Sequence, residues 1–104
     1  MGYFEVPPDH TMDVAEITTL CIESGARAVL LDAEAIPAKF FDLSSGFAGE
    51  LLHRLDLYGI RLAGVVPDPS VHSDPFQRLV TEVNRGKVFN FFGSRAEAVA
   101  WLEG

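Results

Sequence analysis

Cysteine is scarce in this chain of 104 residues, and Cys21 is the only one. A lone cysteine can form no internal disulfide bond, so we expect a reducing, cytoplasmic environment. Long apolar runs are also missing, because no stretch approaches the roughly 18 residues that a membrane-spanning helix needs. The first residues carry neither the basic cluster nor the apolar core of a secretory signal. We therefore expect no membrane partner.

Basic residues are few, and they are unevenly distributed. The formal net charge is −7, from 8 lysines and arginines against 15 aspartates and glutamates. Residues 1–52 hold nine of the acids and two of the bases, whereas residues 53–104 hold six of each. A nucleic-acid partner requires a basic face that neutralises phosphates, so we expect none. The acidic first half suits either a basic protein partner or a surface tuned for solubility.

The common catalytic and metal-binding patterns are missing too. His10, His53 and His72 share no ligand spacing with one another or with Cys21, which argues against a zinc site. The sequence has no glycine-rich phosphate loop, and the order of its serines, histidines and aspartates does not indicate a catalytic triad. We therefore expect no metal, no cofactor and no enzymatic activity.

The chain does have enough apolar material for a core, with 48% hydrophobic residues. One domain is the natural prediction for this length. Apolar residues at helical spacing alternate with short apolar runs, which predicts a single α/β domain whose mainly parallel, four-stranded sheet is packed with three or four helices. The expected strands are 3–6, 28–31, 61–66 and 88–92, the expected helices are 13–23, 44–58, 75–86 and the residues after Ser94, and 35–41 is expected as a turn or single helical turn.

Helix ends are predicted from the residues that usually occupy them. We expect Asp9 or Thr11 to cap the first helix and Ser44 or Ser45 to cap the second. Gly86 is expected in the left-handed conformation at the end of the third helix. The last helix is expected to begin at Ser94, with Glu97 completing a capping box.

The segment around residues 42–50 offers the most chemistry. Asp42, the hydroxyls of Ser44 and Ser45, and Gly46 stand directly before an amphipathic stretch. A hydroxyl at a helix N-terminus can cap the helix, bind an anion or accept a phosphoryl group. The sequence leaves these alternatives open.

Two acids follow predicted strands. Asp32 and Asp68 stand at the carboxyl ends of their strands, which is the edge at which open α/β sheets bind ligands. Together with Glu50 they define a candidate site for a divalent ion or a small molecule. The simpler alternative is that such acids cap helices or form turns, and Asp68 suits a turn because it lies between two prolines.

Three further polar residues are candidates for a ligand or partner surface. Glu50 can pair with Arg85 or Lys87, face a ligand, or stabilise the dipole of its own helix. Asn84 and Arg85 either present an anion-binding group or simply end a helix.

Several separated clusters agree in order and spacing with a known family. The chain resembles the domain-of-unknown-function 4180 family from about Val14 to Leu102, and this resemblance implies a fold without implying an activity. The clusters that carry it are Phe40–Leu43, Gly46, Ala48–Glu50, Tyr58, Glu82 and Asn84–Gly86.

A more distant resemblance concerns the order of strands and helices. The chain is similar to sulfate-transporter and anti-sigma-factor-antagonist (STAS) domains, in which an apolar strand ends in aspartate and an Asp-Ser-Ser-Gly element opens a helix. This chain has Leu43 between Asp42 and the serine pair. By this similarity, Ser45 corresponds to the serine that is phosphorylated in anti-sigma-factor antagonists. The matching segments are Val29–Asp32, Ser44–Gly46, Ile60–Val66, Val88–Phe92 and Glu97–Ala98.

From these observations we expect a non-enzymatic, cytoplasmic regulatory or protein-interaction module. Its partner is another protein or a second copy of the chain, and the surface around Asp42–Glu50, with Ser45 as a switch, makes the contact. The alternative is an α/β domain that binds a small molecule or divalent ion through the strand-end carboxylates.

Overall fold

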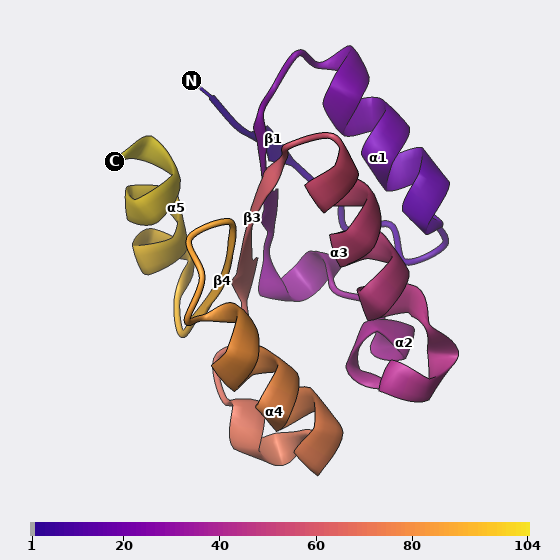
Figure 1. Ribbon diagram of the computed structural model, residues 1–104, viewed down its shortest axis with the longest axis vertical. Coiled ribbons are helices and arrows are strands. Elements are labelled where there is room, and N and C mark those ends of the chain that lie inside the picture. The colour runs from indigo at the N-terminus through magenta and orange to yellow at the C-terminus, as the bar shows by residue number, and fades with distance from the viewer. Residues whose placement is uncertain (1) are drawn as a thin grey trace.

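The computed structural model describes residues 2–104, in which four strands and five helices alternate along the chain (Figure 1). Three short 3₁₀ turns, Ala33–Ala35, Leu43–Ser45 and Pro69–Val71, lie in the connections. The strands are β1 (Phe4–Glu5), β2 (Ala28–Leu31), β3 (Arg61–Val65) and β4 (Phe89–Phe92), and the helices are α1 (Val14–Glu23), α2 (Ala38–Phe41), α3 (Phe47–Leu57), α4 (Asp74–Val83) and α5 (Arg95–Glu103).

The four strands form one parallel sheet in the order β1-β2-β3-β4. A right-handed crossover between consecutive neighbouring strands places every intervening helix on the same face of the sheet. Accordingly, Figure 1 shows α1 and α3 on one side of the strands and α5 on the other. The predicted α/β domain with a parallel, four-stranded sheet is confirmed. The helices number five within residues 2–104 because the expected turn before Asp42 contains a helix of its own, α2.

Strand β2 contributes side chains to two cores, one on each face of the sheet. All four of its residues are buried, as the unbroken apolar run predicts for a strand covered on both sides. Val29 and Leu31 pack into the larger core beneath α1, α2, α3 and α4. Ala28 and Leu30 pack into a smaller core under α5, against Leu102.

The larger core is centred on aromatic rings. Phe40 of α2 is completely buried, and its ring lies edge-on to those of Phe47, Phe76 and Phe91 at centroid distances of 6.0 to 6.2 Å. Edge-on pairs of this kind stabilise a core beyond the area they bury. The short helix α2 is therefore held in place by packing, because four residues are too few for a helix that is stable alone.

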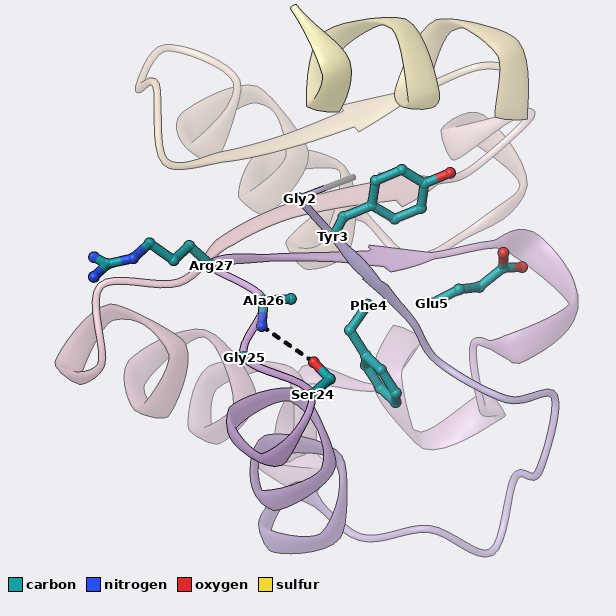
Figure 2. Close-up of a pocket in the computed structure, with 8 residues that line it drawn as sticks. All are labelled: Gly2, Tyr3, Phe4, Glu5, Ser24, Gly25, Ala26 and Arg27. Carbon is teal, nitrogen blue, oxygen red and sulfur yellow. Dashed lines mark hydrogen bonds between the residues drawn. The ribbon is translucent and has the colours of Figure 1, made fainter.

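The two edges of the sheet differ. At one edge β4 runs beside the end of α4, and the amide of Asn84 contacts its backbone. At the other edge lies β1, beside a hollow of about 450 Å³ whose lining residues include Phe4, Ser24 and Arg27 (Figure 2). In Figure 2 the side chains of Tyr3 and Phe4 point to opposite sides of β1.

Some of the predicted helix ends are wrong. Helix α1 is capped by Asp13, with Glu16 completing a capping box, so neither Asp9 nor Thr11 is the cap. Helix α3 begins after Gly46, whose φ of 79° is left-handed, because the two serines belong to a preceding 3₁₀ turn. Gly86 does not adopt the left-handed conformation, since helix α4 ends at Asn84 with an ordinary helical backbone.

Helix α5 begins as predicted. The side chain of Ser94 accepts a hydrogen bond from the backbone N–H of Glu97. The carboxylate of Glu97 accepts from the Ser94 hydroxyl, at 3.1 Å, where a full capping box would have it accept from the backbone of Ser94.

Candidate functional site

Ser45 links helices α2 and α3 through its hydroxyl. Its Oγ donates to the carbonyl oxygen of Lys39 at 2.6 Å and accepts from the backbone N–H of Phe47 at 3.2 Å. The side chain is nevertheless exposed to solvent. The hydroxyl therefore satisfies one of the free N–H groups of α3, as a cap would, although Gly46 occupies the capping position.

A hollow of about 290 Å³ lies beside this serine. Its lining includes residues from the first turn of α1 and the first turn of α3, the helix ends that carry the positive ends of the dipoles. The residues that line it are Asp13, Val14, Ala15, Lys39, Ser45, Gly46, Phe47 and Glu50.

The charges around the hollow are mixed. The ammonium group of Lys39 lies 4.7 Å from the centroid of the Phe47 ring, in a cation–π contact. Asp13 and Glu50 bring carboxylates to the lining of the hollow. Glu50 pairs with Arg54 at 3.3 Å, so a pairing with Arg85 or Lys87, one of the alternatives that the sequence left open, is not the one observed. The hollow therefore combines one cation and two helix N-termini with exposed acids.

Asp42 and Ser44 form a local turn, in which their side chains are hydrogen-bonded to each other. The Oδ1 atom of Asp42 accepts from both the backbone N–H of Ser44, at 3.1 Å, and its hydroxyl, at 2.6 Å. Both residues are exposed. The two neighbouring serines consequently differ, because Ser44 bonds only within its own turn and Ser45 bridges two helices.

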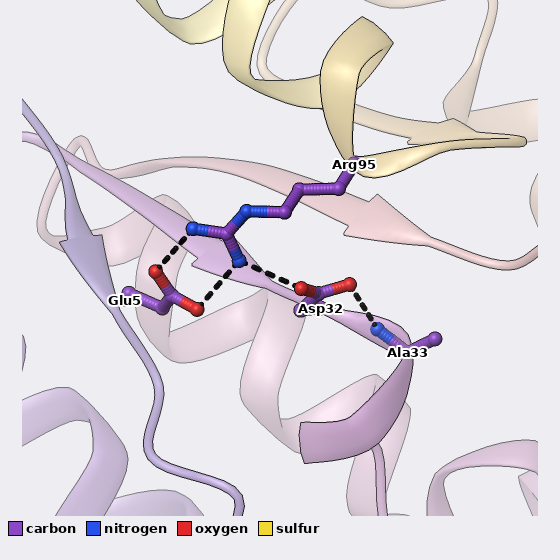
Figure 3. Close-up of polar contacts among 4 residues, drawn as sticks. All are labelled: Glu5, Asp32, Ala33 and Arg95. Atoms are coloured by element: carbon purple, nitrogen blue, oxygen red, sulfur yellow. Dashed lines mark hydrogen bonds and ion pairs between the residues drawn. The ribbon is translucent and has the colours of Figure 1, made fainter.

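Asp32 is part of an ion-pair cluster with Arg95 and Glu5 (Figure 3). The guanidinium of Arg95 holds both carboxylate oxygens of Glu5 and the Oδ2 atom of Asp32, each at 2.7 Å. Asp32 also accepts from the backbone N–H of Ala33. Hydrogen bonds from Arg95 hold the pKa of Glu5 below its usual value. The cluster fastens the start of α5 to β1 and to the end of β2.

Asp68 and Asn84 also have local structural partners. Asp68 caps the 3₁₀ turn Pro69–Val71, and hydrogen bonds from Ser70 hold the pKa of its carboxyl below the usual value. The Oδ1 atom of Asn84 accepts from the backbone N–H of Phe91 at 2.7 Å, while its Nδ2 donates to the Phe91 carbonyl at 3.3 Å. Arg85 is exposed and lines a shallow hollow on α4 together with Arg78.

The structure does not gather the strand-end acids into one site. Asp32 is bonded to Arg95, Asp68 to Ser70 and Glu50 to Arg54. Within residues 2–104, no group of three or more histidine, cysteine, aspartate or glutamate side chains is arranged to hold a metal ion. In the same range, no helix has the length and apolar character needed to cross a membrane.

The single thiol is buried and away from these groups. Cys21 has no exposed surface, and burial raises the pKa of its thiol. A thiol with a raised pKa forms little of the reactive thiolate at neutral pH. We therefore assign Cys21 to the core.

Sequence reasoning missed Arg95 and Glu5 of the ion-pair cluster and Lys39 beside Ser45. Arg95 is the first residue of α5, where a positive charge opposes the helix dipole. An unfavourable base at that position was a signal that carboxylates lie close by. Lys39 gave no comparable signal, because its place beside Phe47 and Ser45 depends on how α2 packs on α3.

Comparison with known proteins identifies the family of the chain and leaves its function open. No curated protein and no solved structure matches the chain. The similarity to STAS domains therefore stays a prediction. A family model described as a domain of unknown function (DUF4180) matches residues 5–102, which is nearly the whole sequence. The chain belongs to the DUF4180 family.

Proposed function

We propose that this domain is a non-enzymatic regulatory module that binds a partner protein through the surface around Asp42–Glu50, and that modification of Ser45 switches the contact. The partner is expected to bring basic or hydrogen-bonding groups, because Asp42 and Glu50 are exposed acids on this surface. The proposal places the module in a cytoplasmic setting, in keeping with its single cysteine.

The observation that carries the proposal is the double role of the Ser45 hydroxyl. It is exposed, so a modifying enzyme can reach it, and it is bonded to two helices at once. Its neighbour Ser44 is also exposed, but its side chain bonds only to Asp42. A chemical change at Ser45 therefore alters the junction of α2 and α3, whereas the same change at Ser44 alters one turn.

A phosphate on Ser45 would change both the charge and the bonding of the surface. It would add about −1.5 to −2 charges and remove the proton that Ser45 donates to Lys39. The dipole of α3 and the ammonium of Lys39 would favour the phosphate, while Asp42 and Glu50 would repel it. The added charge would change the affinity for a partner at this surface, even where it hardly changes the fold.

The test is a quantitative comparison of the proteins that co-purify with four forms of the domain. These are the wild type, Ser45→Ala, Ser45→Asp and the matched control Ser44→Asp, which adds the same charge one residue away. We expect the wild type and Ser44→Asp to retain the same partner and Ser45→Asp to lose it. Equal recovery by all four forms would reduce Ser45 to a structural hydroxyl.

A second measurement addresses the alternative of a ligand-binding domain. A ligand that binds only the folded state raises the unfolding temperature. If divalent ions or nucleotides stabilise the wild type strongly, and Asp32→Asn abolishes the effect, the module proposal should give way to a ligand site at the strand ends.

A further inference from the structure

The sheet has one edge that is partly blocked by a side chain and one that is open. On the outer side of β4, the N–H and C=O of Phe91 are both bonded to the amide of Asn84. An incoming strand cannot pair there without displacing that side chain. Within residues 2–104, no strand lies beyond β1, so β1 is the edge at which a further strand can be added.

The register shows which backbone groups of β1 face outward. Phe4 pairs with Val29 of β2, and the N–H of Val6 donates to the carbonyl of Leu30. Backbone groups of successive residues in a strand point alternately to the two sides. Those of Phe4 and Val6 are directed at β2, so the N–H and C=O groups of Tyr3 and Glu5 face away from the sheet.

We propose that β1 pairs with β1 of a second copy across a two-fold axis, which joins the two sheets into one. A two-fold axis makes the two strands antiparallel. With the axis at Phe4, Tyr3 of each copy lies opposite Glu5 of the other, and the two residues exchange both of their backbone hydrogen bonds. Every outward N–H then meets an outward C=O, so the edge is complementary to itself.

The charges along β1 also favour a second copy in this orientation. The hollow beside β1 has Arg27 near the Gly2 end of the strand and Glu5 toward the other end (Figure 2). Within the described chain Arg27 has no ion-pair partner, whereas Glu5, Asp32 and Arg95 together keep a net negative charge. The antiparallel arrangement brings the positive end of each copy toward the negative end of the other.

This pairing is separate from the proposed partner surface. The hollow beside Ser45 shares no lining residue with the hollow beside β1. A dimer would therefore carry the Asp42–Glu50 surface twice, and either proposal can fail while the other holds.

The first test is the monomer–dimer equilibrium, measured by sedimentation from about 10 µM to about 1 mM protein, the range suited to a weak contact. Tyr3→Pro removes an outward N–H and leaves the bonds to β2 in place. Tyr3→Ala is its matched control, because it loses the same ring and keeps the N–H. We expect wild type and Tyr3→Ala to dimerise and Tyr3→Pro to dimerise at least about tenfold more weakly.

Charge reversal gives a second pair of variants. Arg27→Glu should weaken dimerisation several-fold, and Arg85→Glu, which reverses an exposed arginine on α4, should leave it unchanged. The unfolding temperatures of Tyr3→Pro and Tyr3→Ala are compared to show that both are folded.

A measurement on the wild type alone needs no folded variant. Amide exchange of Tyr3 and Glu5 should slow as protein concentration rises, while that of Phe4 and Val6, already bonded to β2, should not change. A protein that stays monomeric throughout the range would overturn the proposal. So would a dimer that Tyr3→Pro does not weaken, or one in which the Tyr3 and Glu5 amides remain as fast as in the monomer.

Discussion

At the scale of single residues, Gly64 and Phe91 show the closest fit in the sheet. A Cβ atom at Gly64 would lie 2.6 Å from two carbons of the Phe91 ring. Gly64 is on the central strand β3 and is buried, so neither backbone nor ring can move far. The glycine is therefore required by packing, since its backbone conformation is one that any residue adopts.

We predict that Gly64→Ala lowers the free energy of unfolding by about 1–3 kcal/mol, the usual range for overpacking a core. Urea denaturation measures the change. In the double variant Gly64→Ala/Phe91→Leu the smaller side chain relieves the contact. Its loss in free energy of unfolding should therefore be smaller than the sum of the losses of the two single variants. Strictly additive effects would mean that the ring does not restrict this position.

Gly49 is the opposite case, a helical glycine that the isolated domain does not need. It lies in α3, and a Cβ atom there would meet nothing within 4 Å. Because alanine favours a helix over glycine, we predict that Gly49→Ala raises the free energy of unfolding by about 0.5–1 kcal/mol. A destabilised variant in the same urea experiment would show that α3 is constrained in a way the structure does not reveal.

Asn84 is a third single-residue case. Its side chain bonds to the backbone of β4 on the side where a neighbouring strand would otherwise pair. Asn84→Ala would leave the N–H and C=O of Phe91 without their partner. We predict a loss of about 1–3 kcal/mol in the free energy of unfolding, the usual effect of removing a hydrogen-bond partner from a shielded group. Thr81→Ala, on an exposed turn of the same helix, is the control and should change stability by less. Equal losses would refute the assigned role.

At the scale of elements, α5 is attached to the sheet by packing and by ions. Its apolar residues cover the smaller core, and Arg61 adds a cation–π contact with Trp101 at 4.2 Å. Arg95 ties its first turn to β1 and β2 through Glu5 and Asp32. These ion pairs are largely exposed, so we expect them to direct the start of the helix more than to stabilise the fold.

The Glu5 carboxyl gives this attachment a definite pH dependence. Arg95 lowers the pKa of Glu5 in the folded state, so the unfolded chain binds a proton more readily. The resulting stabilisation is complete above the ordinary glutamate pKa of about 4.3 and is lost as the pH falls through the lower, folded-state value.

We predict that Glu5→Gln removes part of the acid-induced loss of stability seen in wild type, as measured by urea denaturation at a series of pH values. Glu23→Gln, which removes an exposed glutamate at the end of α1, is the matched control for the loss of one carboxylate. If Glu5→Gln and wild type lose stability in parallel below about pH 4.3, the ion pair contributes nothing measurable.

Sequence patterns predicted the elements better than their junctions. Residues 28–31 form an unbroken apolar run, and alternation of such runs with helical patterns implied a parallel sheet. The cap of α1 was missed because several acids and hydroxyls precede the helix, and their spacing alone does not show that Asp13 is the one used. Ser45 was selected from the sequence as a hydroxyl before a helix, but its bond to Lys39 depends on the position of α2.

The ion-pair cluster was beyond the reach of sequence patterns. Arg95 and Glu5 are separated by 90 positions in the chain, and nothing local links them. The bond of Asp32 to Arg95 could not be predicted either. The sequence identified Asp32 only as an acid at the end of a strand. Contacts of this kind are set by how strands and α5 assemble, not by the spacing of residue types.

At the scale of the whole molecule, the two proposed surfaces lie on separate parts of the domain. The β1 edge would join two copies, and each copy would present one Asp42–Glu50 surface. Two linked surfaces bind a partner that also has two sites more tightly than either surface alone. The dimer would therefore strengthen partner binding without adding a contact to the partner.

The most direct test of the regulatory proposal is the dissociation constant of the co-purified partner for four forms of the domain. We predict that Ser45→Asp weakens binding at least about tenfold, or about 1.4 kcal/mol. Ser45→Ala and the control Ser44→Asp should stay within about threefold of wild type, because neither places a charge at the junction of α2 and α3. Equal dissociation constants for Ser45→Asp and Ser44→Asp would contradict the claim that Ser45 switches this surface.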